Sequence, residues 1–179
     1  MTAIAEKATT DKATTDKATY PAHPDFFAEQ LRACRTFFER TTSVFTEEHA
    51  SYAPQEGRMT VAAQIAHVAD TFDWFHDALL DMQGFDMDFE AMAKRVNSVK
   101  TLAEAREWFD RGHERLVAYV EASTPESMGV RLPENDPIMP GQSRAAILLA
   151  VIEHAAHHRG SLAIFARLAG LEPPMPYGE

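Results

Sequence analysis

The sequence predicts an all-α protein, a four-helix bundle built as one globular domain. Three observations lead to this prediction. Four long segments place apolar residues at intervals of three and four, which is the spacing of one face of an α-helix. Residues that favour helix N-caps stand before three of these segments. Proline and glycine mark the connections and no stretch indicates a regular sheet, so the helices have to pack against one another.

The first 20 residues differ in composition from the rest of the chain. The pentad Lys-Ala-Thr-Thr-Asp occurs at 7–11 and 12–16 and begins again at Lys17. Almost no large apolar residue follows Ile4 there, so burial cannot offset the loss of chain entropy. We expect a disordered tail over residues 1–20 and the bundle over residues 21–179, and we assign the tail no function.

The first two helices follow this tail. The first is expected from about Asp25 to His49, and the second from the N-cap Thr60 to about Gln83, before Gly84. The apolar residues that define the first helix share helical spacing: Phe26, Phe27, Leu31, Cys34, Phe38, Val44 and Phe45.

The third and fourth helices have clear start signals. The capping box Thr101-Leu-Ala-Glu104 begins the third helix, which should end near Ser123. Ser143 is the expected N-cap of the fourth helix, which should run to about Leu168, before Gly170.

Two connections between these helices are long. Residues 84–100 are expected to hold a short helix around Phe89–Arg95, and residues 124–142 carry four prolines and suit extended pieces. Connections of this length mean that helices adjacent in the sequence need not be antiparallel neighbours in the bundle.

Charge and composition narrow the classes of partner. Lys and Arg number 17 against 27 Asp and Glu, which gives a formal net charge of −10. This balance, without a basic patch, opposes binding to nucleic acid and to anionic membrane surfaces. No apolar run approaches the roughly 20 residues that span a bilayer, and no secretory signal is evident at the N-terminus. We expect a cytoplasmic protein whose partner is a small molecule or another protein chain.

The single cysteine, Cys34, cannot form an internal disulfide or a multi-cysteine zinc site. It lies in the first helical pattern beside Phe37 and Phe38, which indicates a small buried hydrophobe and not a nucleophile. Candidate metal ligands are therefore sought among the eight histidines.

Three histidines gather on the expected last helix. A rotation of about 100° per residue places His154 and His158 within the apolar stripe and His157 on its flank. Residues at i and i+4 project from one face, so these two imidazoles can converge on one divalent cation. The His-Glu-x-x-His zinc motif uses the same spacing, but Ala155 stands where that motif has its glutamate base.

A third ligand has to come from another helix, because a catalytic zinc site usually takes three ligands from the protein. The expected second helix offers His67 and His76, and the third helix offers His113. The helical wheel favours His76, at the edge of the apolar stripe, over His67, which shares a flank with Trp74. The pattern alone leaves the third ligand open.

Four segments resemble the DinB/YfiT-like family, and the likeness extends from about Phe26 to Gly178. The segments are Arg58-Met-Thr-Val-Ala-Ala-Gln-Ile-Ala-His67, Glu153-His-Ala-Ala-His-His-Arg-Gly160, Phe165-Ala-Arg-Leu-Ala-Gly170 and Pro173-Pro-Met-Pro-Tyr-Gly178. One departure is Ser161, where many family members have glutamine; it changes hydrogen bonds around the site but not the ligands.

The resemblance implies a DinB-like bundle with a non-standard helix order and a divalent metal ion held by His67, His154 and His158. Zinc or nickel suits three imidazoles best, and iron, manganese or copper also binds such ligands. A homodimer is expected.

For function, the resemblance implies a metal-dependent hydrolase, or a transferase or isomerase that uses a low-molecular-weight thiol such as bacillithiol or mycothiol. Either activity needs an open coordination position on the metal. The alternative is a non-catalytic dimeric binding or stress-response protein whose structural metal is closed by a fourth ligand such as His76 or His113. Asp70 and Asp73 are interpreted as a solvated acidic face, and Glu153 as pointing away from the stripe.

Overall fold

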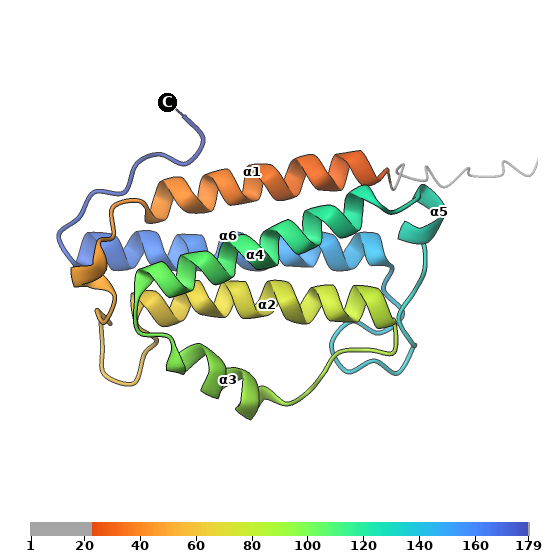
Figure 1. Ribbon diagram of the computed structural model, residues 1–179, viewed down its shortest axis with the longest axis horizontal. Coiled ribbons are helices and arrows are strands. Elements are labelled where there is room, and N and C mark those ends of the chain that lie inside the picture. The colour runs from red at the N-terminus through yellow and green to blue at the C-terminus, as the bar shows by residue number, and fades with distance from the viewer. Residues whose placement is uncertain (1–22, 179) are drawn as a thin grey trace, which may run out of the picture.

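The computed structural model describes residues 23–178, so the expected tail over residues 1–20 lies outside the described part of the chain. Within that part the protein has six α-helices, one 3-10 helix and no strand, which confirms the predicted fold class. In chain order the elements are α1 (Pro24–Thr42), the 3-10 helix η1 (Glu47–His49), α2 (Val61–Asp81), α3 (Phe89–Ser98), α4 (Leu102–Glu121), α5 (Pro125–Met128) and α6 (Arg144–Leu168). The long helices α1, α2, α4 and α6 form the bundle (Figure 1).

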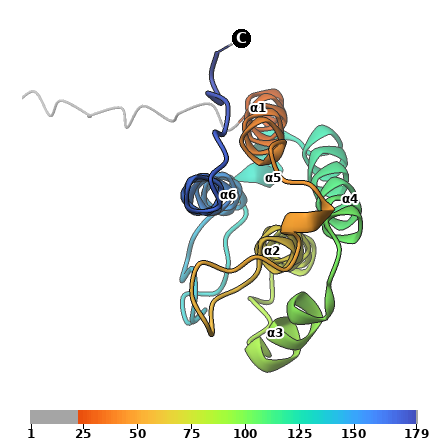
Figure 2. The same ribbon diagram turned by 90° about the vertical axis from the view of Figure 1, so that its left-hand side faces the viewer.

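The order of the helices around the bundle differs from a simple up-and-down arrangement. Seen end-on, α1 and α2 occupy opposite corners, and α4 and α6 occupy the other two (Figure 2). Both α1 and α2 therefore pack on α4 and α6. Helices α2 and α4 run in the same direction, so residues 82–101 return along the side of the bundle and carry α3 (Figure 1). Consecutive long helices are thus not antiparallel neighbours in space, which the long connections allowed.

The first helix is shorter than predicted, because it ends at Thr42 and not near His49. Hydroxyl groups of the last residues bond back to carbonyl oxygens of the helix, for example Thr42 Oγ1 to the Phe38 carbonyl at 2.9 Å. Such side-chain bonds compete with continuation of the backbone ladder. Phe45 lies in the turn after the helix and is nevertheless buried, so the apolar spacing in the sequence continues past the end of the helix.

The 3-10 helix η1 that follows α1 ties the start of α4 to the bundle. The Glu47 carboxylate accepts hydrogen bonds from the backbone N–H groups of Leu102 at 2.9 Å and Ala103 at 2.8 Å. An acidic group at a helix N-terminus satisfies free N–H groups and complements the helix dipole. This contact anchors the end of the crossover connection.

The other helix starts agree with the predicted caps. Thr60, Thr101 and Ser143 each accept a hydrogen bond from the backbone of their own first turn. The short helix expected around Phe89–Arg95 is α3, and the short α5 was not predicted although Thr124 and Ser127 form a capping box there. The proline-rich connection contributes one isolated bridge, between residues 131 and 143.

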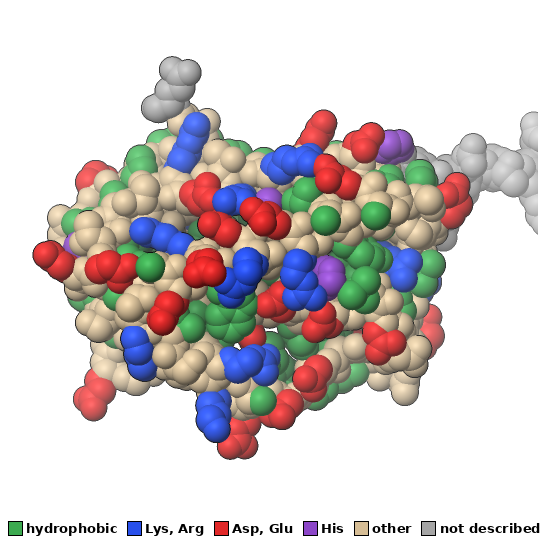
Figure 3. Space-filling model, viewed as in Figure 1, with side chains coloured by type: hydrophobic (Ala, Val, Ile, Leu, Met, Phe, Trp, Pro, Cys, Tyr) green, Lys and Arg blue, Asp and Glu red, His purple; other side chains and the backbone are tan. Residues whose placement is uncertain are grey.

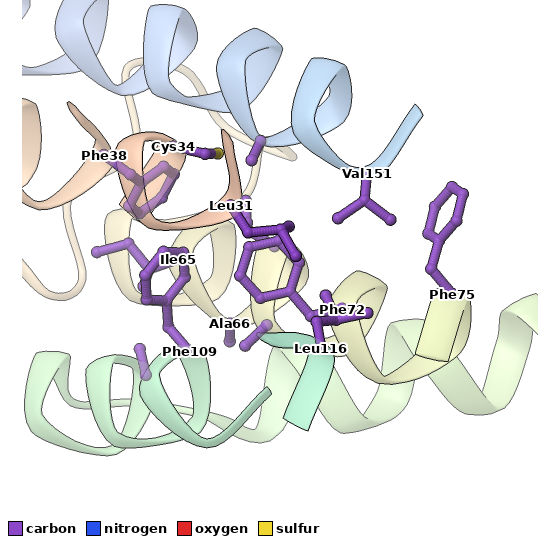
Figure 4. Close-up of a cluster of buried hydrophobic side chains, with 14 of the residues drawn as sticks. Leu31, Cys34, Phe38, Ile65, Ala66, Phe72, Phe75, Phe109, Leu116 and Val151 are labelled. Carbon is purple, nitrogen blue, oxygen red and sulfur yellow. The ribbon is translucent and has the colours of Figure 1, made fainter. Parts of the chain in front are cut away.

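One contiguous hydrophobic core fills the space between the four long helices (Figure 4). Helix α4 approaches α2 so closely at Gly112 that an added Cβ would lie 3.1 Å from Phe72 Cβ and 3.3 Å from the Ala69 carbonyl oxygen. Cys34 belongs to this core, and burial raises the pKa of its thiol to about 11. Its interpretation as a small buried hydrophobe is confirmed.

Acidic and basic side chains are interspersed over the face of the bundle that carries α3 and α4 (Figure 3). Among the helices of residues 23–178, none combines the length and apolar character that a membrane crossing requires.

Candidate metal centre

The structure brings together His67 of α2 and His154 and His158 of α6. One ligand nitrogen from each imidazole can be chosen so that all three lie within 4.8 Å of one another. The ring centroids are 4.5 Å apart for His154 and His158, 4.7 Å for His67 and His158, and 5.1 Å for His67 and His154. The i, i+4 pair therefore meets the third histidine across the α2–α6 contact.

The position of α2 explains why His67 reaches this cluster although it lies off the apolar stripe. Helix α2 packs on α4, α6 and α3, and most of its circumference is buried. A helical wheel that assumes one buried stripe ranks His76 above His67, but a helix with three neighbours has several inward faces. The cluster contains His67 and not His76, in contrast to the preference of the wheel, for this reason.

The two other buried histidines are engaged elsewhere. His76 Nδ1 accepts a hydrogen bond from Arg115 at 3.0 Å, and His113 Nε2 donates to the Leu31 carbonyl oxygen at 2.9 Å. Within residues 23–178, no fourth histidine, cysteine or carboxylate joins the cluster of three. A site closed by His76 or His113 is therefore not what the structure contains.

On α6 the histidine pair lies at the edge of the buried stripe and not at its centre. The fully buried positions are Ile147, Leu148, Val151, Ala155, Leu162 and Ala166. His154 and His158 are half-buried on the side that faces α2, whereas His157 is exposed. Ser161 bonds to the His157 carbonyl oxygen at 3.3 Å and makes no hydrogen bond to the three histidines.

Gln64 is a neighbour of the cluster that the sequence did not single out. It lies one turn before His67, its side chain is buried, and its amide nitrogen is 3.1 Å from His158 Nδ1. Because the two ends of a glutamine amide are assigned from their surroundings, the amide oxygen can equally accept from an Nδ1–H of His158. That tautomer leaves His158 Nε2 with a free lone pair.

Two buried polar atoms at the cluster have no hydrogen-bond partner in the described residues. They are His154 Nδ1 and Gln64 Oε1; the other unpartnered side-chain atoms in residues 23–178 are Asp70 Oδ2 and His113 Nδ1. An unpaired buried polar atom costs about 1–3 kcal/mol, so each one calls for a partner. Pairing Gln64 Oε1 with His158 leaves the amide nitrogen without a partner instead, so this arrangement exchanges one unpaired group for another. For His154 Nδ1, a bound cation is the kind of partner that an imidazole nitrogen takes.

Burial lowers the pKa of all three histidines. The pKa of His154 falls to about 4 and that of His158 to about 3, because burial and then the neighbouring imidazoles disfavour the charged form. Burial also lowers the pKa of His67, against the opposing effect of the Asp70 carboxylate. All three rings are neutral near pH 7, which is the form that binds metal.

The carboxylates near the cluster differ from the solvated face that the sequence suggested. Asp70 is 2% exposed, and its Oδ1 accepts from Arg95 Nε at 3.0 Å. Asp73 accepts from the Trp108 indole at 2.7 Å and pairs with Arg115. Helices α3 and α4 cover this side of α2, which a single-helix pattern does not reveal. Glu153 is exposed on α6, as predicted.

A cavity of about 190 Å³ lies beside the cluster, between α2, α3 and α6. His67 and His154 are part of its wall. The remaining wall residues are Met59, Thr71, Trp74, Phe89, Met92, Ala93 and Val96. Two of the three histidines therefore face a space that a small molecule can enter.

Comparisons with known proteins identify the fold and the family of this chain. No curated protein matches the sequence. Among solved structures, the fold is similar to that of YfiT from Bacillus subtilis, at 16% identity and a TM-score of 0.66, over 83% of this chain and 89% of that chain. YfiT is described as a probable metal-dependent hydrolase with an unusual four-helix bundle topology. The model of the DinB superfamily matches residues 30–162, a span that includes all three clustered histidines, and the chain belongs to this superfamily.

Proposed function

We propose that this protein is a metal-dependent hydrolase in which His67, His154 and His158 hold one divalent cation. The observation that carries the proposal is the cluster itself, three imidazoles from two helices with ligand nitrogens within 4.8 Å of one another. Their lowered pKa values keep them neutral, and the unpartnered Nδ1 of His154 fits a site that takes an external partner. Zinc or nickel is the proposed ion, since imidazole ligands suit both.

An open coordination position separates a catalytic ion from a structural one. Structural zinc sites are closed by four protein ligands, whereas catalytic sites use three. The described residues supply three, and the 190 Å³ cavity reaches His67 and His154. Both observations favour catalysis over a purely structural metal.

The chemistry that such a cation supplies is Lewis-acid activation of water or of a thiol. We favour hydrolysis because water is the only co-substrate it needs, and because the part of the chain that the structure describes places no charged side chain in the cavity wall for a charged thiol cofactor. The likeness of the fold to YfiT, described as a probable metal-dependent hydrolase, supports the same choice. Thiol S-transfer is the second candidate, in line with the resemblance to thiol-dependent relatives.

Elemental analysis of tag-free protein tests the site. The wild type is expected to hold about one metal ion per chain, and His67→Ala, His154→Ala and His158→Ala to hold little. His157→Ala is the matched control, because this neighbour on α6 is exposed and should leave the metal content unchanged. Metal retained at the wild-type level in all three ligand variants would overturn the site.

Activity assays then separate the two candidate reactions. Metal-loaded protein is tested against a panel of neutral esters, amides and lactones, and against monochlorobimane with each low-molecular-weight thiol. Hydrolysis that depends on the metal supports the proposal, and thiol transfer without hydrolysis favours the second candidate. A metal-loaded protein inactive in both assays favours a binding or stress-response role.

We further propose that the protein works as a cytoplasmic homodimer that uses the outer face of α6. On this helix, the side chains of Leu149, Ile164 and Leu168 are 51%, 58% and 62% exposed. Large apolar side chains exposed together on one helix indicate an interface with another protein chain. Light scattering with Ile164→Lys tests this: the wild type should have twice the mass of one chain and the variant the mass of one. A wild type that is monomeric would refute the dimer.

A further inference from the structure

We propose that the cavity beside the histidines binds an uncharged apolar group of the substrate, such as a phenyl ring or a short branched alkyl chain, and that α3 sets which group fits. This inference rests on the proposed function for the role of the metal. The binding of the apolar group itself depends only on the cavity wall.

The wall opposite the histidines is one face of α3. Its four members, Phe89, Met92, Ala93 and Val96, follow the spacing i, i+3, i+4, i+7, which places them side by side on one helix face. Met92 is 8% exposed, yet it is not part of the contiguous core between the long helices. The apolar face of α3 therefore lines the cavity as well as the bundle.

The side-chain hydrogen-bond donors in the wall, apart from the histidines, are already paired. Thr71 Oγ1 donates to the His67 carbonyl oxygen at 2.8 Å, and Trp74 Nε1 donates to the Asp86 carbonyl oxygen at 2.7 Å. What the cavity offers a ligand is thus apolar surface and the imidazoles of His67 and His154. A charged group placed there would lose its hydration without gaining a partner in the wall.

The neighbouring cavity shows the contrast within the same molecule. It has a volume of about 500 Å³ and shares Trp74 with the first cavity. Its wall carries seven charged residues, Asp70, Asp73, Asp77, Asp81, Asp86, Arg95 and Arg115. Charged and uncharged side chains are therefore sorted to the two sides of Trp74, and the histidines of the cluster lie on the uncharged side.

Size and access fit a small ring. A dry apolar cavity of about 150 Å³ is known to bind benzene, so about 190 Å³ holds a ring with a short substituent. Phe89 and Met59 are 50% and 38% exposed, so the cavity reaches solvent beside them. A substrate can thus place its apolar group against α3 and its reactive group at the histidines.

The test uses two measurements on full-length protein labelled at the methionine methyl groups with carbon-13. In chelator-treated protein, toluene is expected to shift the Met59 and Met92 methyl signals saturably, while benzoate at the same concentration does not. In zinc-loaded protein, benzohydroxamate should bind roughly tenfold more tightly than acetohydroxamate, since the ring adds apolar contacts.

Variants of the wall complete the test. Met92→Trp should fill the cavity and abolish both the toluene shift at Met59 and the benzohydroxamate preference, with the zinc content unchanged. Leu80→Trp, at an exposed position near the end of α2 and away from both the cavity and the proposed dimer face, is the matched control and should bind as the wild type does. Met92→Ala, which enlarges the cavity, should admit 1-methylnaphthalene.

The outcomes distinguish this inference from the proposed function. Benzoate that binds as well as toluene, or a toluene shift that survives Met92→Trp, would overturn the apolar site. Toluene binding in a protein that holds neither zinc nor nickel would leave the apolar site standing and refute the metal centre instead.

Discussion

Five histidines lie buried or half-buried on the long helices that follow α1, and they fall into two groups. His76 and His113 have protein partners, namely Arg115 and the Leu31 carbonyl oxygen. His67, His154 and His158 face one another, and Nδ1 of His154 has no partner in the described residues. The first two histidines are held singly by partners within the chain, although Nδ1 of His113 is also unpartnered, whereas the second group brings three imidazoles together as a metal ion requires.

The largest expected difference between the groups is in metal affinity. His154→Ala should weaken zinc binding roughly a hundredfold or more, because about 10–16 kcal/mol of binding energy is shared among four ligands in zinc sites. His76→Ala should leave zinc affinity unchanged. Competition with a chromogenic chelator measures both, and equal losses in the two variants would erase the distinction between the groups.

Gln64 provides a second test of this comparison, because its side-chain amide contacts one member of the cluster, His158. Gln64→Leu removes the amide at His158 Nδ1 and should weaken zinc binding about tenfold, the lower end of the usual effect of such supporting residues. Gln64→Glu, which can still accept from Nδ1–H, should bind zinc nearly as the wild type does. The expected ¹⁵N signature is a His158 ring protonated at Nδ1 in the zinc-bound wild type; a ring protonated at Nε2 would contradict this role.

In metal-free protein, His113 should matter more than His154 for the free energy of unfolding, which reverses their order for metal affinity. His113→Leu removes an unpartnered nitrogen too, but it also loses the buried hydrogen bond to the Leu31 carbonyl oxygen and should lower the free energy of unfolding by about 1 kcal/mol. His154→Leu removes an unpartnered nitrogen and should change stability by less than about 0.5 kcal/mol or raise it. Urea unfolding at pH 7 with a chelator present measures both changes. A His154→Leu variant that is the less stable of the two would show that this ring is a structural residue.

The smallest effect expected is the acid sensitivity of the metal-free protein. The folded-state pKa values of His154 and His158 are about 4 and 3, below the ordinary 6.5, so the unfolded chain binds more protons below pH 6.5. Stability should therefore fall as the pH drops from 6.5, by about 1 kcal/mol at pH 5 after allowance for partial solvent screening.

The double variant His154→Leu/His158→Leu is the control for this pH effect. It removes the two rings with the lowest pKa values, so its unfolding free energy should fall less between pH 6.5 and pH 5 than that of the wild type. Equal slopes in the two proteins would place the acid sensitivity elsewhere.

Local sequence signals determined the starts of three long helices and the histidine pair. The caps Thr60, Thr101 and Ser143 mark helix starts because a side-chain oxygen satisfies N–H groups within the same turn. His154 and His158 share a face because four residues make just over one helical turn. Both features depend on residues close in the chain, so the sequence was sufficient for them.

Only the tertiary structure decided what lies across from that pair. The inward faces of α2 depend on its three neighbours, and those follow from a helix order that places α1 and α2 at opposite corners. This packing brings His67 and Gln64 to the histidine pair, buries Asp70, and sets one face of α3 against the cavity. Residues far apart in the chain meet there through packing, which local periodicity does not encode; the histidine pair was predictable, and its surroundings were not.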